Sequence, residues 1–513
     1  MEDHLTMDED SWAMFGRPIF DDPAAKSLAR VGVVDVGSNS VRLVIFDGAA
    51  RSPAYFFNEK VLCGLGAGMA ETGHLNPDGR QRALAALRRF QAIAKGMGIA
   101  PLMAVATAAV REAKDGPAFR EEIERETGLR LEVIDGREEA RLSAQGVLLG
   151  WPEADGLVCD IGGSSMELAL VQNGEIGWRE TSPLGPLELA KLQGDEGTLN
   201  DWITSHLRAM REDLPNPPKR MYLVGGSWRA VARLDMVRRS YPLKVLHEYR
   251  ISPEGLAETL DLVERSDPTE LRKRAGVSGD RMALIPLASR VLAGLSKVLA
   301  PEEFYISSYG LREGLLYESM PKDLRARDPL IEACLHAEAR NARVPGFGRI
   351  LYEFLRPLYR DSSPEELRII KAACLLHDVS WRTHPDYRAE VCFDYATRAN
   401  LGGLTHSERV FLGLALMHRY KNSRGGRAKS LLSLIDEAAE KKAEILGKAM
   451  RFGAMFSAES HPDMGLLELD LEKETLSLHL SSSSAELFGE VALGRFQSLA
   501  RALSLSPMVV QQS

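Results

Sequence analysis

An acidic residue beside a turn of small hydroxyl residues is the first feature of this sequence that could do chemistry. Residues 31–47 read VGVVDVGSNSVRLVIFD: an apolar β-branched run carries Asp35, breaks at Gly37-Ser38-Asn39-Ser40 and resumes as a second apolar run. The pattern predicts a strand, a tight turn and a second strand. Backbone N–H groups and hydroxyls in such a turn can bind phosphate oxygens, while the carboxylate holds a divalent cation or its waters. Taken alone, a turn of this composition more often has a purely structural role.

The same pattern returns at Leu157. The segment LVCDIGGSSMELALV again places an acid, Asp160, at the end of an apolar run, which then turns on Gly162-Gly163-Ser164-Ser165. When the two segments are overlaid without gaps, Asp160 falls on Asp35, Gly162 on Gly37 and Ser165 on Ser40. A repeated unit of this kind predicts two α/β domains with the same start, facing each other across a cleft.

Two further glycine and serine segments precede predicted helices. The short strand Tyr222–Val224 leads into Gly225-Gly226-Ser227 and a helical run, and Ser307, Ser308 and Gly310 stand ahead of a helix that carries Arg312. Free amides at a helix N-terminus meet the positive end of the helix dipole, so both segments are candidate anion sites. For either one alone, ordinary helix capping is the alternative.

The elements around these motifs alternate between helix and strand. Helical spacing is present at Pro77–Lys95 and Pro117–Thr127, with strands at Pro101–Ala106 and Leu129–Ile134. The segment Thr107–Lys114 leaves the first of these strands and carries Arg111 near its end. A further helix follows from Asp135 to about Leu149. This alternation predicts an α/β domain.

From about Pro321 the spacing becomes helical nearly throughout. Beyond Ser457, the alternation in LLELDLEKETLSLHL predicts a hairpin, followed by a last helix at Ala485–Leu503, which together indicate a small α+β segment. The five helices predicted before it are Ile331–Ala342, Phe347–Tyr359, Pro364–Leu376, His406–Tyr420 and Leu431–Met450.

Composition limits the class of protein. The 513 residues are 45% hydrophobic and 27% charged, which is typical of a soluble globular protein with several domains. A net charge of −8 argues against a general nucleic-acid binder.

No apolar run is long enough to span a membrane. The acidic start, MEDHLTMDEDSWAMFG, has no signal-peptide pattern and predicts a disordered leader of a cytoplasmic protein. Five scattered cysteines are expected to be reduced, buried thiols.

Six motifs in order carry a family resemblance: VVDVGSNSVRLVI, ATAAVREA, IDGREEARLSAQGV, DIGGSSMELALV, VGGSWRAVARL and SSYGLREGLLYE. They resemble the exopolyphosphatase / guanosine pentaphosphate phosphatase family, a branch of the actin-like, sugar-kinase-like phosphotransferases, over residues 30–318. The segments LLHDVSW and HPDYR resemble the family's degenerate HD-type domain.

The resemblance implies an α/β fold of two duplicated actin-like (ribonuclease H-like) domains, followed by an all-helical HD-like domain and a small α+β C-terminal segment. The expected boundaries are residues 1–28 for the leader, 29–150 and 151–318 for the actin-like domains, 319–445 for the helical domain and 446–513 for the C-terminal segment.

The activity implied is Mg²⁺-dependent, processive hydrolysis of the terminal phosphoanhydride of inorganic polyphosphate, by a cytoplasmic homodimer whose helical domain guides the chain. A guanosine pentaphosphate (pppGpp) 5′-phosphohydrolase is the alternative within the same chemistry. A non-catalytic sensor of alarmone nucleotides or polyphosphate and a sugar or acetate kinase are alternatives of other kinds.

The resemblance also assigns roles to residues. Glu139 matches the family's catalytic glutamate, which aligns the attacking water, and Glu167 matches a second essential acid that acts on the water or the metal. Asp35 and Asp160 are expected to hold Mg²⁺, directly or through its waters. The guanidiniums of Arg111 and Arg312 are expected to bind phosphate oxygens and to support the transition state. The other expected phosphate-binding residues are Ser38, Asn39, Ser40, Gly162, Gly163, Ser165, Gly225, Gly226, Ser227 and Arg229.

Two features depart from a simple match. The family turn usually carries a third glycine where this chain has Ser164, so backbone access to phosphate could be narrower there, or the hydroxyl could add a donor. The pair His377-Asp378 could bind a second metal only with further ligands, for which His336, His384 and His418 are the candidates. A structural remnant that packs the helices is the favoured interpretation of this pair.

Overall fold

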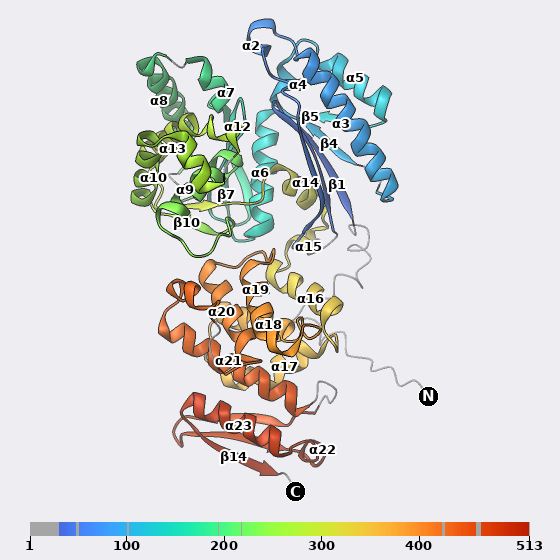
Figure 1. Ribbon diagram of the computed structural model, residues 1–513, viewed down its shortest axis with the longest axis vertical. Coiled ribbons are helices and arrows are strands. Elements are labelled where there is room, and N and C mark those ends of the chain that lie inside the picture. The colour runs from blue at the N-terminus through green and yellow to red at the C-terminus, as the bar shows by residue number, and fades with distance from the viewer. Residues whose placement is uncertain are drawn as a thin grey trace. The chain divides into compact units, whose positions relative to one another are not determined.

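The computed structural model describes residues 30–47, 51–99, 102–192, 194–216, 218–276, 278–422, 426–457 and 463–511, so the predicted leader at residues 1–28 lies outside the described residues. The chain divides into two compact units, one ending at Ala326 and the other beginning at Arg327 (Figure 1). Each unit is described by itself below.

The unit that ends at Ala326 contains two sheets with the same strand order. The five strands of the first sheet lie in the order β3-β2-β1-β4-β5, with β1 to β3 antiparallel and β4 and β5 parallel to β1. Its strands are β1 (Val31–Val36), β2 (Ser40–Phe46), β3 (Tyr55–Leu62), β4 (Met103–Ala106) and β5 (Leu131–Val133).

The second sheet has the order β10-β11-β9-β6-β7-β8, with β6 to β8 antiparallel and β9 and β11 parallel to β6. It repeats the first sheet and adds β10 antiparallel at one edge. The duplication predicted from the repeated motif is therefore present in the strand order. The strands are β6 (Gly156–Ile161), β7 (Met166–Gln172), β8 (Glu175–Ser182), β9 (Arg220–Val224), β10 (Tyr249–Ile251) and β11 (Glu303–Ile306).

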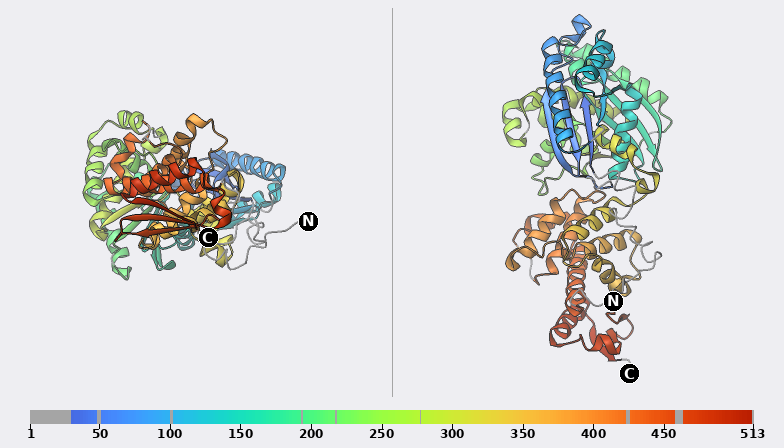
Figure 2. Two further views of the ribbon diagram at one scale, coloured as in Figure 1. Left: turned by 90° about the horizontal axis from the view of Figure 1, so that it is seen from below. Right: turned by 90° about the vertical axis from the view of Figure 1, so that its right-hand side faces the viewer.

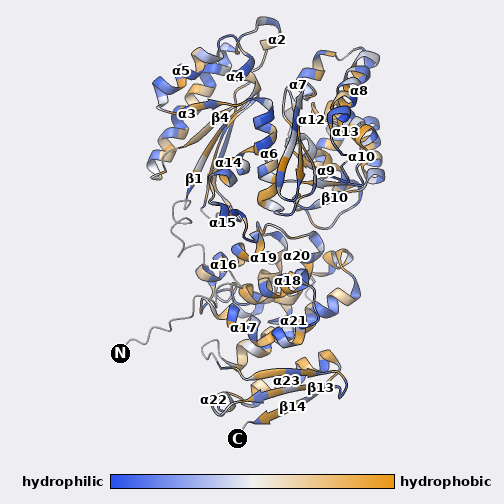
Figure 3. Ribbon diagram, turned by 180° about the vertical axis from the view of Figure 1, so that it is seen from behind, coloured by the Kyte–Doolittle hydropathy of each residue, from blue (hydrophilic) through white to orange (hydrophobic). Residues whose placement is uncertain are grey.

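Helices cover the two sheets, and their ends follow the local sequence. Helix α3 (Pro77–Gly96) begins where Asn76 accepts a hydrogen bond from the Gly79 N–H at 2.8 Å and so caps the N-terminus. Figure 3 shows β7 mainly in the hydrophobic colour and α5 mainly in the hydrophilic colour. The other helices of this unit, apart from α6 and α14, are α2 (Met69–Thr72), α4 (Ala108–Glu112), α5 (Gly116–Thr127), α7 (Pro186–Leu189), α8 (Glu196–Asp213), α9 (Gly226–Arg238), α10 (Pro253–Arg265), α11 (Pro268–Ala275), α12 (Gly279–Met282), α13 (Ile285–Leu299) and α15 (Lys322–Arg325).

Helices α6 (Gly136–Gly150) and α14 (Leu311–Ser319) cross between the two sheets (Figure 1). The crossing is close because both helices carry a glycine there: a Cβ on Gly146 would lie 2.2 Å from the Gly310 carbonyl oxygen, and one on Gly314 would lie 1.8 Å from that of Leu142. Although α6 belongs to the predicted domain 29–150, its alanines and valine pack on the second sheet. Helix α14, at the end of the second repeat, contacts β1 of the first.

The unit that begins at Arg327 is helical up to Phe456. All five predicted helices are present. The predicted helix Leu431–Met450 is divided into a 3₁₀ turn and α21. Asp436 caps the N-terminus of α21 by accepting a hydrogen bond from the Ala439 N–H at 2.7 Å. One helix was missed, although its buried residues Ala389, Cys392, Phe393 and Ala396 follow the i, i+3, i+4, i+7 spacing of an amphipathic helix. The predicted boundary at residue 445 falls within α21. The helices are α16 (Pro329–Asn341), α17 (Phe347–Leu355), α18 (Pro364–Leu376), α19 (Arg388–Arg398, the one that was missed), α20 (His406–His418) and α21 (Glu437–Phe456).

A small sheet completes this unit. The predicted hairpin is formed by β12 (Leu466–Asp470) and β13 (Thr475–Leu480), and the predicted last helix is α23 (Glu490–Leu503), which lies along one face of the sheet (Figure 2). A third strand, β14 (Ser506–Gln511), was not predicted and pairs parallel to β13.

Among the described residues, no helix combines the length and apolar character needed to cross a membrane. All five cysteines are buried and unpaired, as expected for reduced thiols.

Candidate active site

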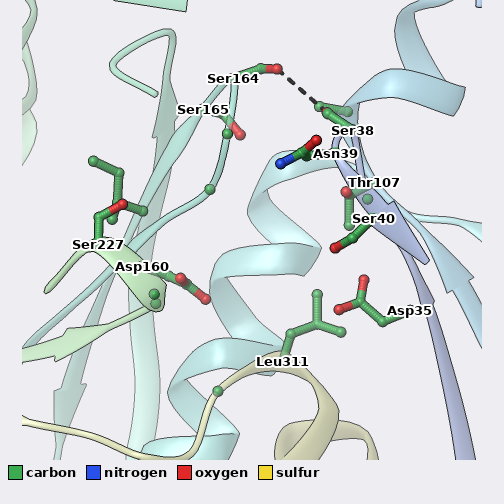
Figure 4. A pocket seen from close by; sticks show the side chains of 18 of the residues that line it. Asp35, Ser38, Asn39, Ser40, Thr107, Asp160, Ser164, Ser165, Ser227 and Leu311 are labelled. Atoms are coloured by element: carbon green, nitrogen blue, oxygen red, sulfur yellow. Dashed lines mark hydrogen bonds between the residues drawn. The ribbon is translucent and has the colours of Figure 1, made fainter. Parts of the chain in front are cut away.

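A cavity of about 590 Å³ lies between the two hairpin turns of the first unit, and it gathers most of the predicted site residues (Figure 4). The predicted residues that line it are Asp35, Ser38, Asn39, Ser40, Glu139, Asp160, Gly162, Gly163, Ser165, Gly225, Gly226, Ser227, Arg229 and Arg312. Of the predicted set, Arg111 and Glu167 are not among its lining residues.

The two turns have the same hydrogen bond and touch each other. The Gly37 N–H donates to the Ser40 carbonyl at 3.0 Å, and the Gly162 N–H donates to the Ser165 carbonyl at 2.9 Å. Across the cleft, the Ser164 hydroxyl donates to the Ser38 hydroxyl at 3.4 Å (Figure 4). Ser164 therefore contributes a polar link between the two turns.

Asp35 and Asp160 lie on opposite walls of the cavity (Figure 4). Asp35 accepts a hydrogen bond from Arg312 Nη1 at 3.1 Å, and Asp160 accepts one from the hydroxyl of Ser143. Burial raises the pKa of Asp160, and the hydrogen bond from Ser143 opposes the rise. Asp35 thus accepts a hydrogen bond from a residue of α14, and Asp160 accepts one from a residue of α6. Both carboxylates keep oxygen lone pairs for a further ligand.

Glu139 lies in the first turn of α6, which Asp135 caps by accepting from the Glu138 N–H at 2.7 Å. Its Oε2 atom is buried without a hydrogen-bond donor among the described residues, and lies 3.9 Å from Arg111 Nη1. Burial raises the pKa of Glu139, and the carboxylates of Glu167 and Asp160 add to the rise, whereas Arg111 opposes it.

Glu138, the neighbouring acid, has a different environment from Glu139. It accepts hydrogen bonds from Arg141 on the same helix, with Nε at 2.8 Å and Nη2 at 2.5 Å. This pairing leaves Glu138 as a structural residue of α6.

Glu167 and Arg111 lie behind the wall of the cavity. Glu167 is 1% exposed, and its Oε1 accepts from the Thr181 hydroxyl at 3.2 Å. The pKa of Glu167 is raised to about 8, chiefly by burial; hydrogen bonds from Ser165 and Thr181 oppose the rise and the charge of Asp160 supports it. Arg111 donates to the Ile134 carbonyl at 2.9 Å and lines a neighbouring cavity instead.

The polar side chains that line the cavity and were missed from sequence include Arg42, Lys60 and Thr107. Burial and, to a smaller extent, the charge of Arg312 lower the pKa of Arg42 to about 10. Arg229 is affected in the same way. Guanidiniums crowded together out of water favour a bound anion, and the Nε atom of Arg312 is buried without an acceptor among the described residues. The sequence contained a signal for Arg42. When the two hairpins are overlaid, Arg42 falls on Glu167, which was predicted to be a site residue.

The turn before α9 requires glycine. Gly225 has φ 108°, and a Cβ there would lie 2.7 Å from the Ile161 carbonyl oxygen and 3.1 Å from Asp160 Oδ1. The backbone of Gly225 and Gly226 can therefore approach Asp160 and any ligand held beside it. Arg229, one turn into α9, is fixed by donating to the Ser308 carbonyl at 3.0 Å.

A divalent cation suits this donor set only in part. Among the described residues, no three acidic, histidine or cysteine side chains come close enough together to enclose a metal ion. Carboxylate oxygens of Asp35, Asp160 and Glu139 nevertheless converge on one cavity, and a buried Glu139 oxygen has no donor. Mg²⁺ is commonly held by one or two carboxylates together with phosphate oxygens and water, so the residues fit a cation that arrives with its substrate.

The histidine and aspartate of the helical unit are engaged in other contacts. Asp378 forms a bidentate ion pair with Arg343, at 2.7 Å to Nε and 2.8 Å to Nη2. His377 Nδ1 lies 2.7 Å from the Cys374 carbonyl oxygen. These contacts fix the end of α18 and neutralise the carboxylate.

Two family models and several known proteins match this chain. The model of the Ppx/GppA phosphatase family matches residues 44–323, and that of the exopolyphosphatase C-terminal region matches residues 357–506. Exopolyphosphatase 1 of Mycobacterium tuberculosis is 26% identical over 324 residues, which cover 61% of this chain and 94% of that protein. The guanosine-5′-triphosphate,3′-diphosphate pyrophosphatase of Aeromonas hydrophila is 23% identical over 413 residues, covering 75% of this chain and 80% of that protein. The crystal structure of an exopolyphosphatase from Cytophaga hutchinsonii covers 57% of this chain and 97% of its own, at 25% identity and a TM-score of 0.52.

Proposed function

Because the chain belongs to the Ppx/GppA phosphatase family, we propose that it is an exopolyphosphatase, which hydrolyses the terminal phosphoanhydride of inorganic polyphosphate and releases orthophosphate. The observation that carries this proposal is the cavity itself. It combines a buried carboxylate, Glu139, with the crowded guanidiniums of Arg42, Arg229 and Arg312. A long polyanion supplies the negative charge that such a cluster needs.

Glu139 is the proposed general base. A water oxygen attacks the terminal phosphorus, and the carboxylate of Glu139 accepts a proton from that water. The bond between the phosphorus and the bridging oxygen breaks, and its electron pair stays on the bridging oxygen of the shortened chain. The products are one orthophosphate and a polyphosphate shorter by one unit.

The hairpin turns and arginines hold the reacting groups in place. Hydroxyls of Ser38, Ser40 and Ser165 and the backbone amide of Gly163 surround the position proposed for the terminal phosphate, whereas the Gly162 amide is used within its own turn. The arginines bind the next phosphates, so that charge developing in the transition state meets fixed donors. Asp35 and Asp160 would hold Mg²⁺, which would supply positive charge to the phosphoryl oxygens.

Hydrolysis of guanosine pentaphosphate at its 5′ end is the second candidate. The relative from Aeromonas hydrophila carries a name for this reaction, and its match extends over 75% of the chain. Both substrates present a terminal phosphoanhydride to the same donors, so the cavity suits either of them. Turnover on long polyphosphate and on the nucleotide, measured at equal concentration with Mg²⁺, distinguishes the two candidates.

The enzyme proposal is tested by comparing phosphate release and binding in the wild type and Glu139→Gln. We expect the wild type to release orthophosphate from polyphosphate with Mg²⁺ present, and the variant to bind the polymer without hydrolysing it. If the wild type bound the polymer and released nothing, the sensor function would replace the enzyme. Transfer of phosphate to a metabolite hydroxyl without hydrolysis would instead indicate a kinase. Processivity, a cytoplasmic homodimer and an HD-like origin of the helical unit stay predictions.

A further inference from the structure

A second cavity, of about 640 Å³, adjoins the cleft. It shares Ser38, Ser164, Ser165 and Leu187 with the first cavity, so the linked turns form the wall between the two. Its other walls come from both halves of the unit, including Met69 of α2 and Lys191, which follows α7 (Figure 1).

The groups assigned to the chemistry lie at this wall. Glu139 lines the first cavity, whereas Arg111 and Gly136, which begins the same helix turn as Glu139, line the second. The side chains of Arg111 and Glu139 approach to 3.9 Å between Arg111 Nη1 and Glu139 Oε2. The position next to Glu139 is therefore bordered by both cavities.

In-line displacement assigns a different role to each cavity. The attacking water and the leaving oxygen lie on opposite sides of the phosphorus that is transferred. The shortened chain stays on the side of Arg42, Arg229 and Arg312, which all line the first cavity. The new orthophosphate is left on the side of the water, between Glu139 and the wall. If the first cavity were the only route out, the chain would have to leave before the product could.

We infer that the second cavity is the exit for orthophosphate, an inference that rests on the proposed exopolyphosphatase function. Its cations suit a small dianion and are already partly neutralised. Arg111 is paired with Glu112, at 3.2 Å between Nη2 and Oε1, and Lys191 is paired with Glu188. Cations with carboxylate partners attract phosphate and hold it weakly, which is what a release path requires. The chain can then remain bound between cycles.

The test narrows each cavity in turn. Met69→Trp adds bulk to the wall of the second cavity, and the matched control Leu62→Trp adds it to the rim of the first, where Leu62 is 50% exposed. Acid-quenched samples measure orthophosphate formed on the enzyme, and a fluorescent phosphate sensor measures orthophosphate released into solution. With long polyphosphate and Mg²⁺, we expect Met69→Trp to form the first orthophosphate at the wild-type rate and to release it roughly tenfold more slowly.

Leu62→Trp is expected to raise the KM for polyphosphate and to leave the interval between formation and release unchanged. The inference is overturned if Met69→Trp releases product as fast as it forms, or if Leu62→Trp delays release equally. A wild type that forms no orthophosphate even in acid-quenched samples overturns the proposed function instead, so the two failures are distinct.

A charge variant covers the case in which Met69→Trp does not fold. The Lys191 side chain is 46% exposed, so Lys191→Glu changes the charge of the second cavity with little effect on packing. We expect inhibition by added orthophosphate to weaken several-fold while the KM for polyphosphate stays within twofold of the wild type. Unchanged product inhibition, or a matching rise in the KM for the polymer, would contradict an exit through this cavity.

Discussion

Arg42 and Glu167 occupy the same position in the two copies of one hairpin. Arg42 lies opposite Asp35 in the β1–β2 pair, and Glu167 lies opposite Asp160 in the β6–β7 pair. Residues opposite each other in an antiparallel pair point to the same face, so each aspartate has a charged neighbour. The neighbour is a cation in the first sheet and an acid in the second. The duplicated unit therefore has one half suited to holding phosphate and another suited to raising the pKa of the base.

Replacing Arg42 by methionine is expected to weaken substrate binding more than it slows the chemistry. Hydrogen bonds from a charged donor contribute about 1.5–3 kcal/mol, so the KM for polyphosphate should rise roughly 10- to 100-fold, while kcat should fall less. Steady-state kinetics at fixed ionic strength measure both. Arg89→Met is the matched control, because Arg89 is exposed and pairs only with Glu59 among the described residues. An equal rise in KM in this control would mean that the loss of one positive charge, and not its place in the site, is responsible.

The substitution Glu139→Gln removes the proposed base and keeps the size of the side chain. We expect kcat to fall roughly 10²- to 10⁴-fold, the range for loss of a general base, with the dissociation constant of polyphosphate within about threefold of the wild type. Rapid-mixing phosphate release and equilibrium binding provide the two readouts. The control is Glu138→Gln on the same helix turn, where the paired Glu138 predicts nearly normal turnover. Equal losses in both variants would show that α6 was disturbed and not the chemistry.

The pH profile should respond to the charge of Glu167. A base acts only when deprotonated, so kcat/KM should rise with pH through the pKa of Glu139, which burial and the neighbouring carboxylates raise. Glu167→Gln removes one of these like charges, the pKa of Glu139 then falls, and the acidic limb should move to lower pH. Profiles from pH 5 to 9 at constant ionic strength and Mg²⁺, with Glu138→Gln as reference, measure the shift. A limb that stayed in place or moved to higher pH would exclude this coupling.

Stability of the helical unit should fall as the pH rises from about 4.5 to about 7. Glu338 of α16 is 3% exposed and accepts from the Gly348 N–H at 2.7 Å, and burial raises its pKa from 4.5 to about 7. Because the unfolded chain ionises this group first, the free energy of unfolding decreases across that window and levels off above it, by roughly 3 kcal/mol at most.

The variant Glu338→Gln is expected to lose most of this pH dependence. Urea unfolding of wild type and variant at pH 5 and pH 8, taken as differences at each pH, cancels the contribution of the other groups. An identical pH dependence in the two proteins would show that the stabilising proton is bound elsewhere.

Local patterns were sufficient for much of the fold. The alternation and turn residues around Asp35 and Asp160 predicted both hairpins, because strand periodicity and turn composition depend on neighbouring residues alone. The overlay of the hairpins predicted the duplication, which the strand order bears out. Helix α19 was missed although its buried residues Ala389, Cys392, Phe393 and Ala396 follow helical spacing, so its pattern was present in the sequence. Strand β14 was missed because its pairing with β13 joins segments that are not neighbours in the chain.

The sequence by itself determined the family, the repeated hairpins and the identity of the acids and turn residues, because these depend on residue types and on short spacings. Only the tertiary structure decided which of them share a cavity. Arg42 enters the cleft through the cross-strand register, whereas Arg111 lies beyond the wall formed by Ser38 and Ser164. That arrangement depends on how closely α6 and α14 cross at Gly146 and Gly314, a contact between residues far apart in the chain that no local pattern encodes.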